Sequence, residues 1–172
     1  GFGKKAQSWI SDAPGGDPYG YISEPEDLGS GGGYKTNGCG GGRVKIESRG
    51  TILNNGTISS NGLAGDGDKG GGGSGGSIYI ITRSLEGNGI IEANGGIGNS
   101  YGGGGSGGRI AIHYLDNTSS CLIRALGATG GSVAAENGTI YMPSLDQNSP
   151  VGMSVSTVSY VSTACLLYTS PS

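Results

Sequence analysis

The chain has 172 residues and 40 of them are glycine, roughly three times the ordinary share. Hydrophobic residues make up 33 % of the chain, charged residues 13 %, and the formal net charge is −3. No apolar run approaches the ~20 residues of a membrane-spanning helix, and the basic residues are scattered rather than clustered as in nucleic-acid-binding proteins. This much glycine disfavours an all-α fold and is typical of disordered chains. Whether the chain folds must therefore be judged from the periodicity of its apolar residues.

Both ends of the chain need attention before its fold is considered. The chain begins with Gly1 rather than methionine and shows no signal peptide, so we expect a mature product, a processed fragment or an incomplete reading frame. The last eight residues, Cys165–Ser172, resemble the in-frame translation of a transposon-based sequencing adaptor. We therefore expect the authentic sequence, assembled from environmental or transcriptome reads, to stop near Ala164 and the natural protein to continue.

One block recurs along the chain. It spans 41–62, 75–95 and 107–127, and a shorter copy begins at Asn137. The matched positions Arg43, Ser77, Arg109 and Thr139 are separated by 34, 32 and 30 residues. Each block contains a short strand, a polar turn and a second short strand, and a glycine-rich connector follows it.

Within these strands apolar residues alternate with polar ones, and a period of two places them on one face of a β-strand. One block cannot bury these residues alone, whereas stacked blocks place them over one another about 4.8 Å apart. On the outer face of the second strands we expect Ser59, Glu92 and Arg124 to stack, with Glu92 beside Arg124. The expected core ladder consists of Val44, Ile46, Ile58, Ile78, Ile80, Ile91, Ile110, Ile112, Ile123, Ile140 and Met142.

The repeats predict an all-β fold, a short right-handed parallel β-helix or β-solenoid of about four coils with glycine-rich connectors. A disordered glycine-rich linker would require the alternation to be accidental in three copies. Along the chain we expect an N-terminal entry or cap segment at 1–30, the solenoid at 31–145, a Ser/Val-rich tail or linker strand at 146–164, and non-native residues at 165–172.

The glycine runs have two possible roles. They can supply positive φ at corners and let neighbouring coils pack backbone to backbone, or they can cradle a phosphate. A phosphate loop needs a Lys-Ser/Thr pair that opens a helix after the glycines. Here GGGGSGG leads into a strand and no such pair follows it. We therefore expect the structural role and no cofactor.

The order of these motifs resembles a known class of repeats. Tyr19, Gly20, Pro25 and 29–33 form an entry motif, and GGGGSGG-(S/R)-I-x-I units follow at 70–80 and 102–112, before a closing GTIY at 138–141. This pattern resembles the glycine-rich β-solenoid repeats in large cell-surface proteins of protists. The resemblance covers about residues 15–143 and implies an extracellular, eukaryotic and non-catalytic setting.

Two kinds of covalent modification are suggested by the sequence. N-x-Ser/Thr sequons occur at Asn55, Asn117 and Asn137, at expected turns or strand entries where a glycan can project. Asn-Gly is also a favoured turn dipeptide, but we expect at least one sequon to be occupied. Without the adaptor-like tail two cysteines remain, Cys39 and Cys121, which either form one disulfide or stay unpaired.

No constellation of residues indicates catalysis or metal binding. His113, the only histidine, is expected to face solvent beside Tyr114. Asp66 and Asp68 resemble a fragment of a calcium loop, but no further acidic ligand follows them, so we expect a polar corner. Polyuronide-cleaving β-helix enzymes need clustered charged residues, whereas the outward charges here are isolated at Lys45, Glu47, Glu92 and Arg124. We therefore do not expect an enzyme.

The expected function is that of a secreted structural protein, located outside the cell or on its surface. Open solenoid ends and added strands from the N-terminal region and from Val151–Val161 would give head-to-tail self-association into a filament or coat. The alternative is a spacer or carbohydrate-binding module of a larger adhesin, in which Tyr79, Tyr114 and Tyr141 contact sugars. A polysaccharide-degrading enzyme is a distant third. We expect further copies of the chain as partners, with glycans as a second class, and neither nucleic acid nor a membrane.

Overall fold

The computed structural model describes residues 19–33, 37–130, 133–145 and 158–161, with only the backbone given at Val133 and at 158–161. Expectations for 1–18, for most of the tail and for the adaptor-like Cys165–Ser172 lie outside the described residues. All regular elements in the described part are strands: β1 (Arg43–Leu53), β2 (Thr57–Ser59), β3 (Ser77–Glu86), β4 (Ile90–Glu92), β5 (Arg109–Asn117), β6 (Leu122–Arg124), β7 (Thr129–Gly130), β8 (Val133–Ala134), β9 (Thr139–Tyr141) and β10 (Val158–Val161).

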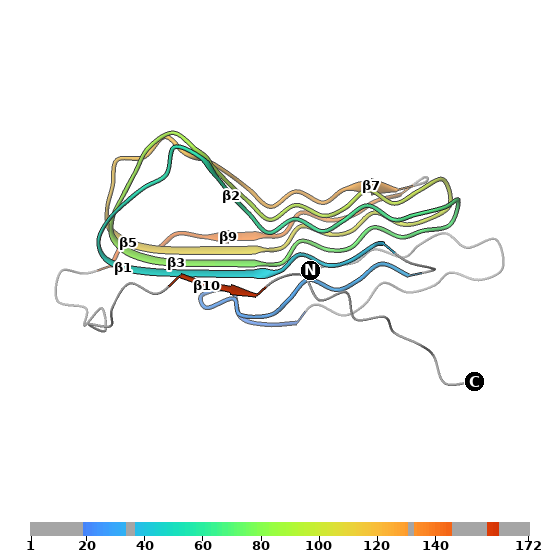
Figure 1. The fold of residues 1–172 in the computed structure, drawn as a ribbon, viewed down its shortest axis with the longest axis horizontal. Coiled ribbons are helices and arrows are strands. Elements are labelled where there is room, and N and C mark those ends of the chain that lie inside the picture. Colours follow the sequence, from blue (N-terminus) through green and yellow to red (C-terminus); the bar gives the residue numbers. More distant parts are fainter. Residues whose placement is uncertain (1–18, 34–36, 131–132, 146–157, 162–172) are drawn as a thin grey trace.

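The strands form a parallel β-solenoid, which confirms the expected fold class (Figure 1). A long sheet contains β1, β3, β5 and β9 in parallel, and a short sheet contains β2, β4 and β6 in parallel. Each coil passes once through both sheets, so the solenoid makes three complete turns between β1 and β9, and β9 begins a fourth. Strands β7 and β8 form a separate antiparallel pair.

The register of the long sheet agrees with the repeat. Val44 pairs with Ile78, Ile78 with Ile110, and Ile110 with Ile140. In the short sheet Ile58, Ile91 and Ile123 lie over one another in the same way. Because side chains alternate between the faces of a strand, this register stacks the isoleucines in the interior.

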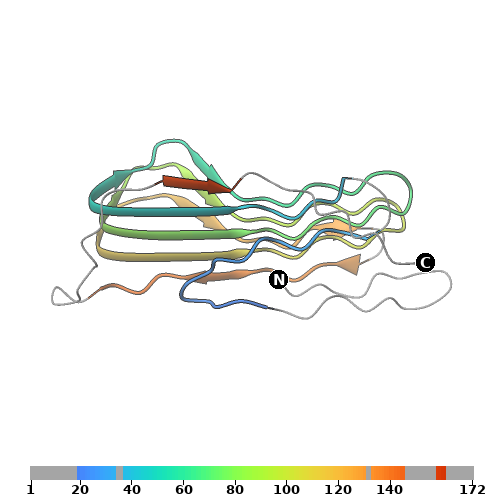
Figure 2. The same ribbon diagram turned by 60° about the horizontal axis from the view of Figure 1, so that its bottom comes forward.

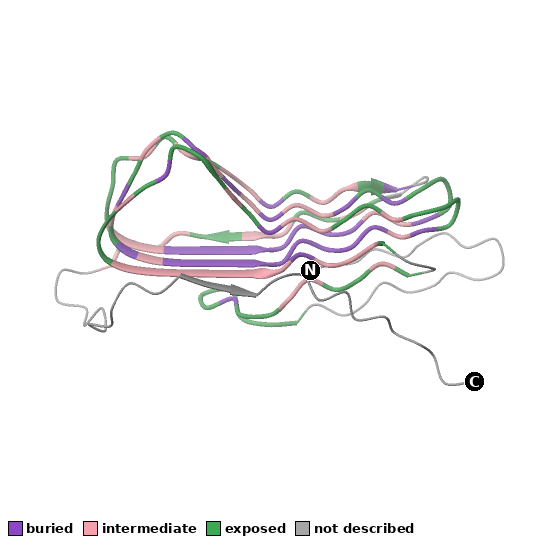
Figure 3. Cartoon of the chain, in the orientation of Figure 1, coloured by how far each residue is buried: buried purple, intermediate pink, exposed green. Residues whose placement is uncertain are grey.

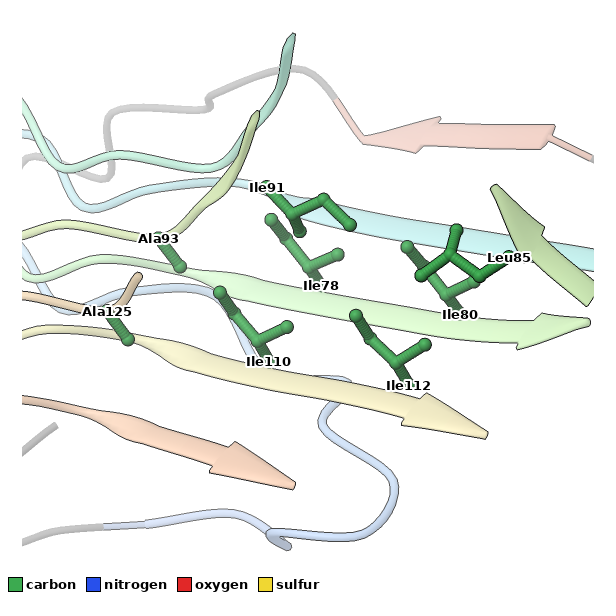
Figure 4. Close-up of a cluster of buried hydrophobic side chains, with 8 residues drawn as sticks. All are labelled: Ile78, Ile80, Leu85, Ile91, Ala93, Ile110, Ile112 and Ala125. Carbon is green, nitrogen blue, oxygen red and sulfur yellow. The ribbon is translucent and has the colours of Figure 1, made fainter. Parts of the chain in front are cut away.

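The core lies between the two sheets, where eight side chains form one buried cluster (Figure 4). Ile140 was expected in this core, but it is 45 % exposed because no further coil of the described chain covers it. Leu85, Ala93 and Ala125 are buried, although the expected ladder did not include them. The cluster consists of Ile78, Ile80, Leu85, Ile91, Ala93, Ile110, Ile112 and Ala125.

We call the part of the solenoid that contains the long and short sheets the wide part. Beside it, the glycine-rich connectors form a long narrow part, which we call the glycine arm (Figure 3). In each coil an outgoing segment leaves the short sheet and a return segment leads back to the long sheet. Buried residues recur along the arm as well as in the long strands (Figure 3). The outgoing segments are 60–65, 93–98 and 125–130, and the return segments are 38–42, 70–76, 102–108 and 134–138.

Two further segments pack on the solenoid. Residues 19–33, which we call the entry segment, lie on the side of the long sheet that faces away from the short sheet (Figure 1), and Pro25 is fully buried there. Strand β10 pairs antiparallel with β1 and covers that edge of the long sheet (Figure 2). Among the described residues, no helix is long and apolar enough to cross a membrane.

Candidate functional site

The most regular polar array in the molecule is the backbone of the glycine arm. Successive amides of the return segment 70–76 donate hydrogen bonds in three directions, and each direction recurs every third residue. From Gly71 to Gly76 in order, the acceptors are the carbonyl oxygens of Gly33, Gly103, Leu63, Ser30, Ser106 and Ser60, at 2.8 to 3.0 Å. The three directions lead to the entry segment, to the next return segment and to the outgoing segment of the same coil.

Glycine is required in this arm because there is no room for a Cβ atom. A methyl group added at Gly73 would fall on the carbonyl oxygen of Cys39, and one added at Gly96 would fall on that of Leu63. Neither glycine needs positive φ: among the described glycines only Gly20, Gly67 and Gly87 have it. Of the two structural roles expected for the glycines, close backbone approach therefore dominates the arm.

The entry segment supplies one of the three directions, and two serines define its contact. The amide of Ser30 donates to Ser74 Oγ at 2.7 Å, and Ser74 Oγ lies 3.2 Å from the Ser30 carbonyl oxygen. Ser106 occupies the equivalent position one coil further along, since Gly75 binds its carbonyl as Gly41 binds that of Ser74. Its hydroxyl is buried and has no hydrogen-bond partner among the described residues.

Toward the strands, the entry segment covers the outer face of the long sheet. Ser77 Oγ donates to the carbonyl of Asp27 at 2.6 Å, and Glu26 lies 3.8 Å from both Arg43 and Lys45. Tyr79 is consequently only 7 % exposed. Burial, together with the neighbouring carboxylates of Glu24, Glu47 and Glu26, raises the pKa of the Tyr79 phenol to about 12.

His113 faces the same outer side but is not simply solvated. Its Nε2 atom lies 2.8 Å from the carbonyl oxygen of Ser23. Its ring meets those of Tyr79 and Tyr141 edge-on, with centroids 5.5 and 5.8 Å apart. Tyr114, expected to be exposed beside it, instead packs half-buried against the hydrophobic core.

These positions correct the tyrosine surface that the adhesin alternative requires. Tyr79 lies beneath the entry segment and Tyr114 packs against the core, so of the three tyrosines expected to contact sugars only Tyr141 is exposed. Alternation along a strand identifies the outer face, but it does not show that another segment covers that face.

The charged ladder of the short sheet is present as expected. Ser59 pairs with Glu92 and Glu92 with Arg124. Glu92 Oε2 lies 2.7 Å from an Arg124 terminal nitrogen and accepts a hydrogen bond from Arg124 Nε at 2.9 Å. This geometry is an arginine–carboxylate pair with two contacts to one oxygen, on a strand whose neighbouring side chain, Ile91, is fully buried.

This ladder also includes two asparagines, which were not among the predicted site residues. Asn61 Nδ2 donates to Glu92 Oε1 at 2.7 Å, and Asn94 Nδ2 donates to Oε2 at 3.0 Å. Burial raises the pKa of Glu92, but the hydrogen bonds from Asn61 and Arg124 outweigh it, so the pKa lies below its usual value. Asn61 Oδ1 also accepts the amide of Asn94 at 2.6 Å. The ladder therefore links three successive coils where the arm begins.

The sequon asparagines lie at the surface, Asn55 and Asn117 in the wide part and Asn137 in a return segment of the arm. Asn55, Asn117 and Asn137 are exposed, and their Oδ1 atoms accept backbone amides of Asn88, Ser119 and Gly127. Cys121 is a free, half-buried cysteine, so no disulfide joins it to Cys39.

The acidic corner lies at the tip of the arm. Asp66 Oδ1 accepts the amide of Gly67 at 2.8 Å, and Oδ2 accepts Asn37 Nδ2 at 3.1 Å. Within the described ranges, no group of three or more His, Cys, Asp or Glu side chains is placed to hold a metal ion.

Comparison with known proteins adds no assignment: no family model, curated protein or solved structure matches this chain.

Proposed function

We propose that this chain is a secreted, non-catalytic structural protein that builds an extracellular filament or cell-surface coat through the ends of its solenoid. The observation that carries this proposal is the end of the isoleucine ladder. Ile110 is 0 % exposed, whereas Ile140, directly above it in register, is 45 % exposed. Leu122 on β6 is 52 % exposed at the same end. A further coil, or a second copy, would bury this surface.

The other end of the long sheet is finished differently. There β10 of the same chain pairs antiparallel with β1, so the tail expected to add a strand to a neighbour adds one to its own solenoid. The long sheet therefore runs from β10 to β9. A contact between the β9 edge of one copy and the β10 edge of the next is heterologous, and such contacts grow filaments when they do not close into rings.

The polar side chains that most resemble catalytic groups take part in structural contacts. The Glu92 carboxylate is bound by Arg124, Asn61 and Asn94, and His113 contacts a carbonyl of the entry segment. These contacts support a non-catalytic role. The exposed sequon asparagines and the resemblance to protist surface repeats support secretion and glycosylation.

The proposal is tested by placing a charge at the open end. We expect Ile140→Lys to abolish assembly, because a lysine cannot be desolvated against an apolar partner. Ile97→Lys is the matched control, since Ile97 is 61 % exposed on the arm, away from this end. Sedimentation velocity and electron microscopy of both variants give the readout. Unaltered filaments from Ile140→Lys would refute assembly through β9, and a monomeric wild-type protein would favour the spacer module of a larger adhesin.

The tail is tested separately by deleting residues 151–164, which removes β10 and uncovers the β1 edge. We expect this deletion to change the length distribution of the assemblies, because the β9 edge of one copy would then meet the β1 edge of the next instead of its β10 edge. Filaments of normal length would remove the tail from the mechanism.

A further inference from the structure

Six Asn-Gly dipeptides occur in the sequence, at Asn37, Asn55, Asn61, Asn88, Asn94 and Asn137. In such pairs the glycine amide nitrogen can attack the asparagine Cγ atom. A C–N bond forms, the bond from Cγ to the side-chain nitrogen breaks, and ammonia leaves. Water then opens the cyclic imide to aspartate or isoaspartate. The reaction needs a glycine amide that is free to approach the side chain, so hydrogen bonding decides which pairs react.

In five of the six pairs the glycine amide is already a hydrogen-bond donor. The acceptors of Gly56, Gly62, Gly89, Gly95 and Gly138 are Asn54 Oδ1 and the carbonyl oxygens of Asn94, Asn54, Leu126 and Ala125, at 2.7 to 3.2 Å. The Gly38 amide donates no hydrogen bond to any described residue. We propose that Asn37 is the site at which this protein deamidates spontaneously in its folded state.

The surroundings of Asn37 favour the same site. Asn37 is exposed, and among the described residues its side chain makes one hydrogen bond, from Nδ2 to the exposed Asp66. By contrast, Asn61 and Asn94 are half-buried and held by Glu92. Asn37 is also the one non-glycine residue with positive φ in the described chain, at 92°, a region in which asparagine is several-fold enriched.

The reaction changes the contact between the arm and the entry segment. Deamidation replaces the donor that faces Asp66 with a second carboxylate, so an attractive contact becomes a repulsive one. Isoaspartate also adds one methylene group to the backbone directly before Gly38, whose carbonyl accepts the Gly32 amide at 2.6 Å. We therefore expect the modified protein to exchange the amide hydrogen of Gly32 faster than the unmodified protein.

The test is incubation of the full chain at mildly alkaline pH, followed by peptide mass mapping with isoaspartate detection. We expect Asn37 to convert at least about tenfold faster than the other five asparagines in the folded protein, because they must wait for local opening. In denaturant all six should convert at comparable rates. Asn37→Gly is the control variant: it accepts positive φ, has no Cγ atom and should lose the first conversion alone.

Two results would overturn this assignment. One is conversion of any other Asn-Gly pair as fast as Asn37 in the folded chain. The other is an intact Asn37 after a time in which the unfolded chain has reacted. Asp66→Ser provides a second readout: it removes one of the two facing carboxylates without creating a new Asn-Gly pair, so after modification it should exchange the Gly32 amide more slowly than the modified protein that keeps Asp66.

Discussion

The wide part of the solenoid and the glycine arm belong to the same coils, yet they are held together in opposite ways. In the wide part, isoleucines with a period of two fill the space between two sheets. In the return segments of the arm most residues are glycine, and backbone amides with a period of three bind neighbours in three directions. The wide part is stabilised by the apolar side chains that it buries. The arm is stabilised by backbone hydrogen bonds, which can form because glycine has no side chain to keep neighbouring segments apart.

The largest expected effect lies in the wide part. Ile110→Ala removes a fully buried side chain and should lower the free energy of unfolding by about 2–5 kcal/mol. Ile140→Ala is the matched control: it lies in the same ladder but at the exposed end, and should cost less than about 1 kcal/mol. Urea denaturation measures both. Equal losses would mean that the ladder end is covered in solution.

A smaller loss is expected when the arm gains a methyl group. Gly73→Ala would place its Cβ on the Cys39 carbonyl oxygen, and we expect about 1–3 kcal/mol of destabilisation from the backbone shift. Gly56→Ala is the control, since nothing lies within 4 Å of its Cβ position. Thermal unfolding distinguishes them. A neutral Gly73→Ala would show that the arm adjusts freely and that its dense packing is not needed.

The smallest effect concerns Glu92, at the junction of the two parts. Its pKa is lowered in the folded chain, so its stabilisation is complete above the unfolded pKa and is lost as the pH falls through the folded value. We expect Glu92→Gln to cost about 1 kcal/mol at neutral pH and to flatten the acid limb of the stability curve. An acid limb identical to that of the wild type would contradict the lowered pKa.

The strand register could be predicted from the sequence because alternation is a local signal. The pairing of Val44, Ile78, Ile110 and Ile140 follows from it directly, as does the stacking of Glu92 on Arg124. Leu85 was missed because the register shifts between Ser48 and Thr51, so the alternation cannot be extended across the shift.

The contacts of the entry segment and the arm could not be predicted in this way. Burial of Tyr79 depends on the entry segment, which is distant in sequence, and the alternation along the strand does not predict that this segment covers Tyr79. Consecutive glycines are identical in the sequence although their amides bind three different segments. The period of three therefore cannot be recognised from the sequence. Asn61 and Asn94 at matched positions were the available signal for the Glu92 network.

The coils also become shorter along the axis. From matched short-sheet positions to the next long strand, the chain runs 20, 19 and 17 residues, from Thr57 to Ser77, Ile90 to Arg109 and Leu122 to Thr139. The molecule therefore tapers from its β1 end to its β9 end. A filament of identical copies joined end to end would step abruptly from a narrow coil to a broad one at every junction, so its outline would be serrated and would reveal the polarity of the filament.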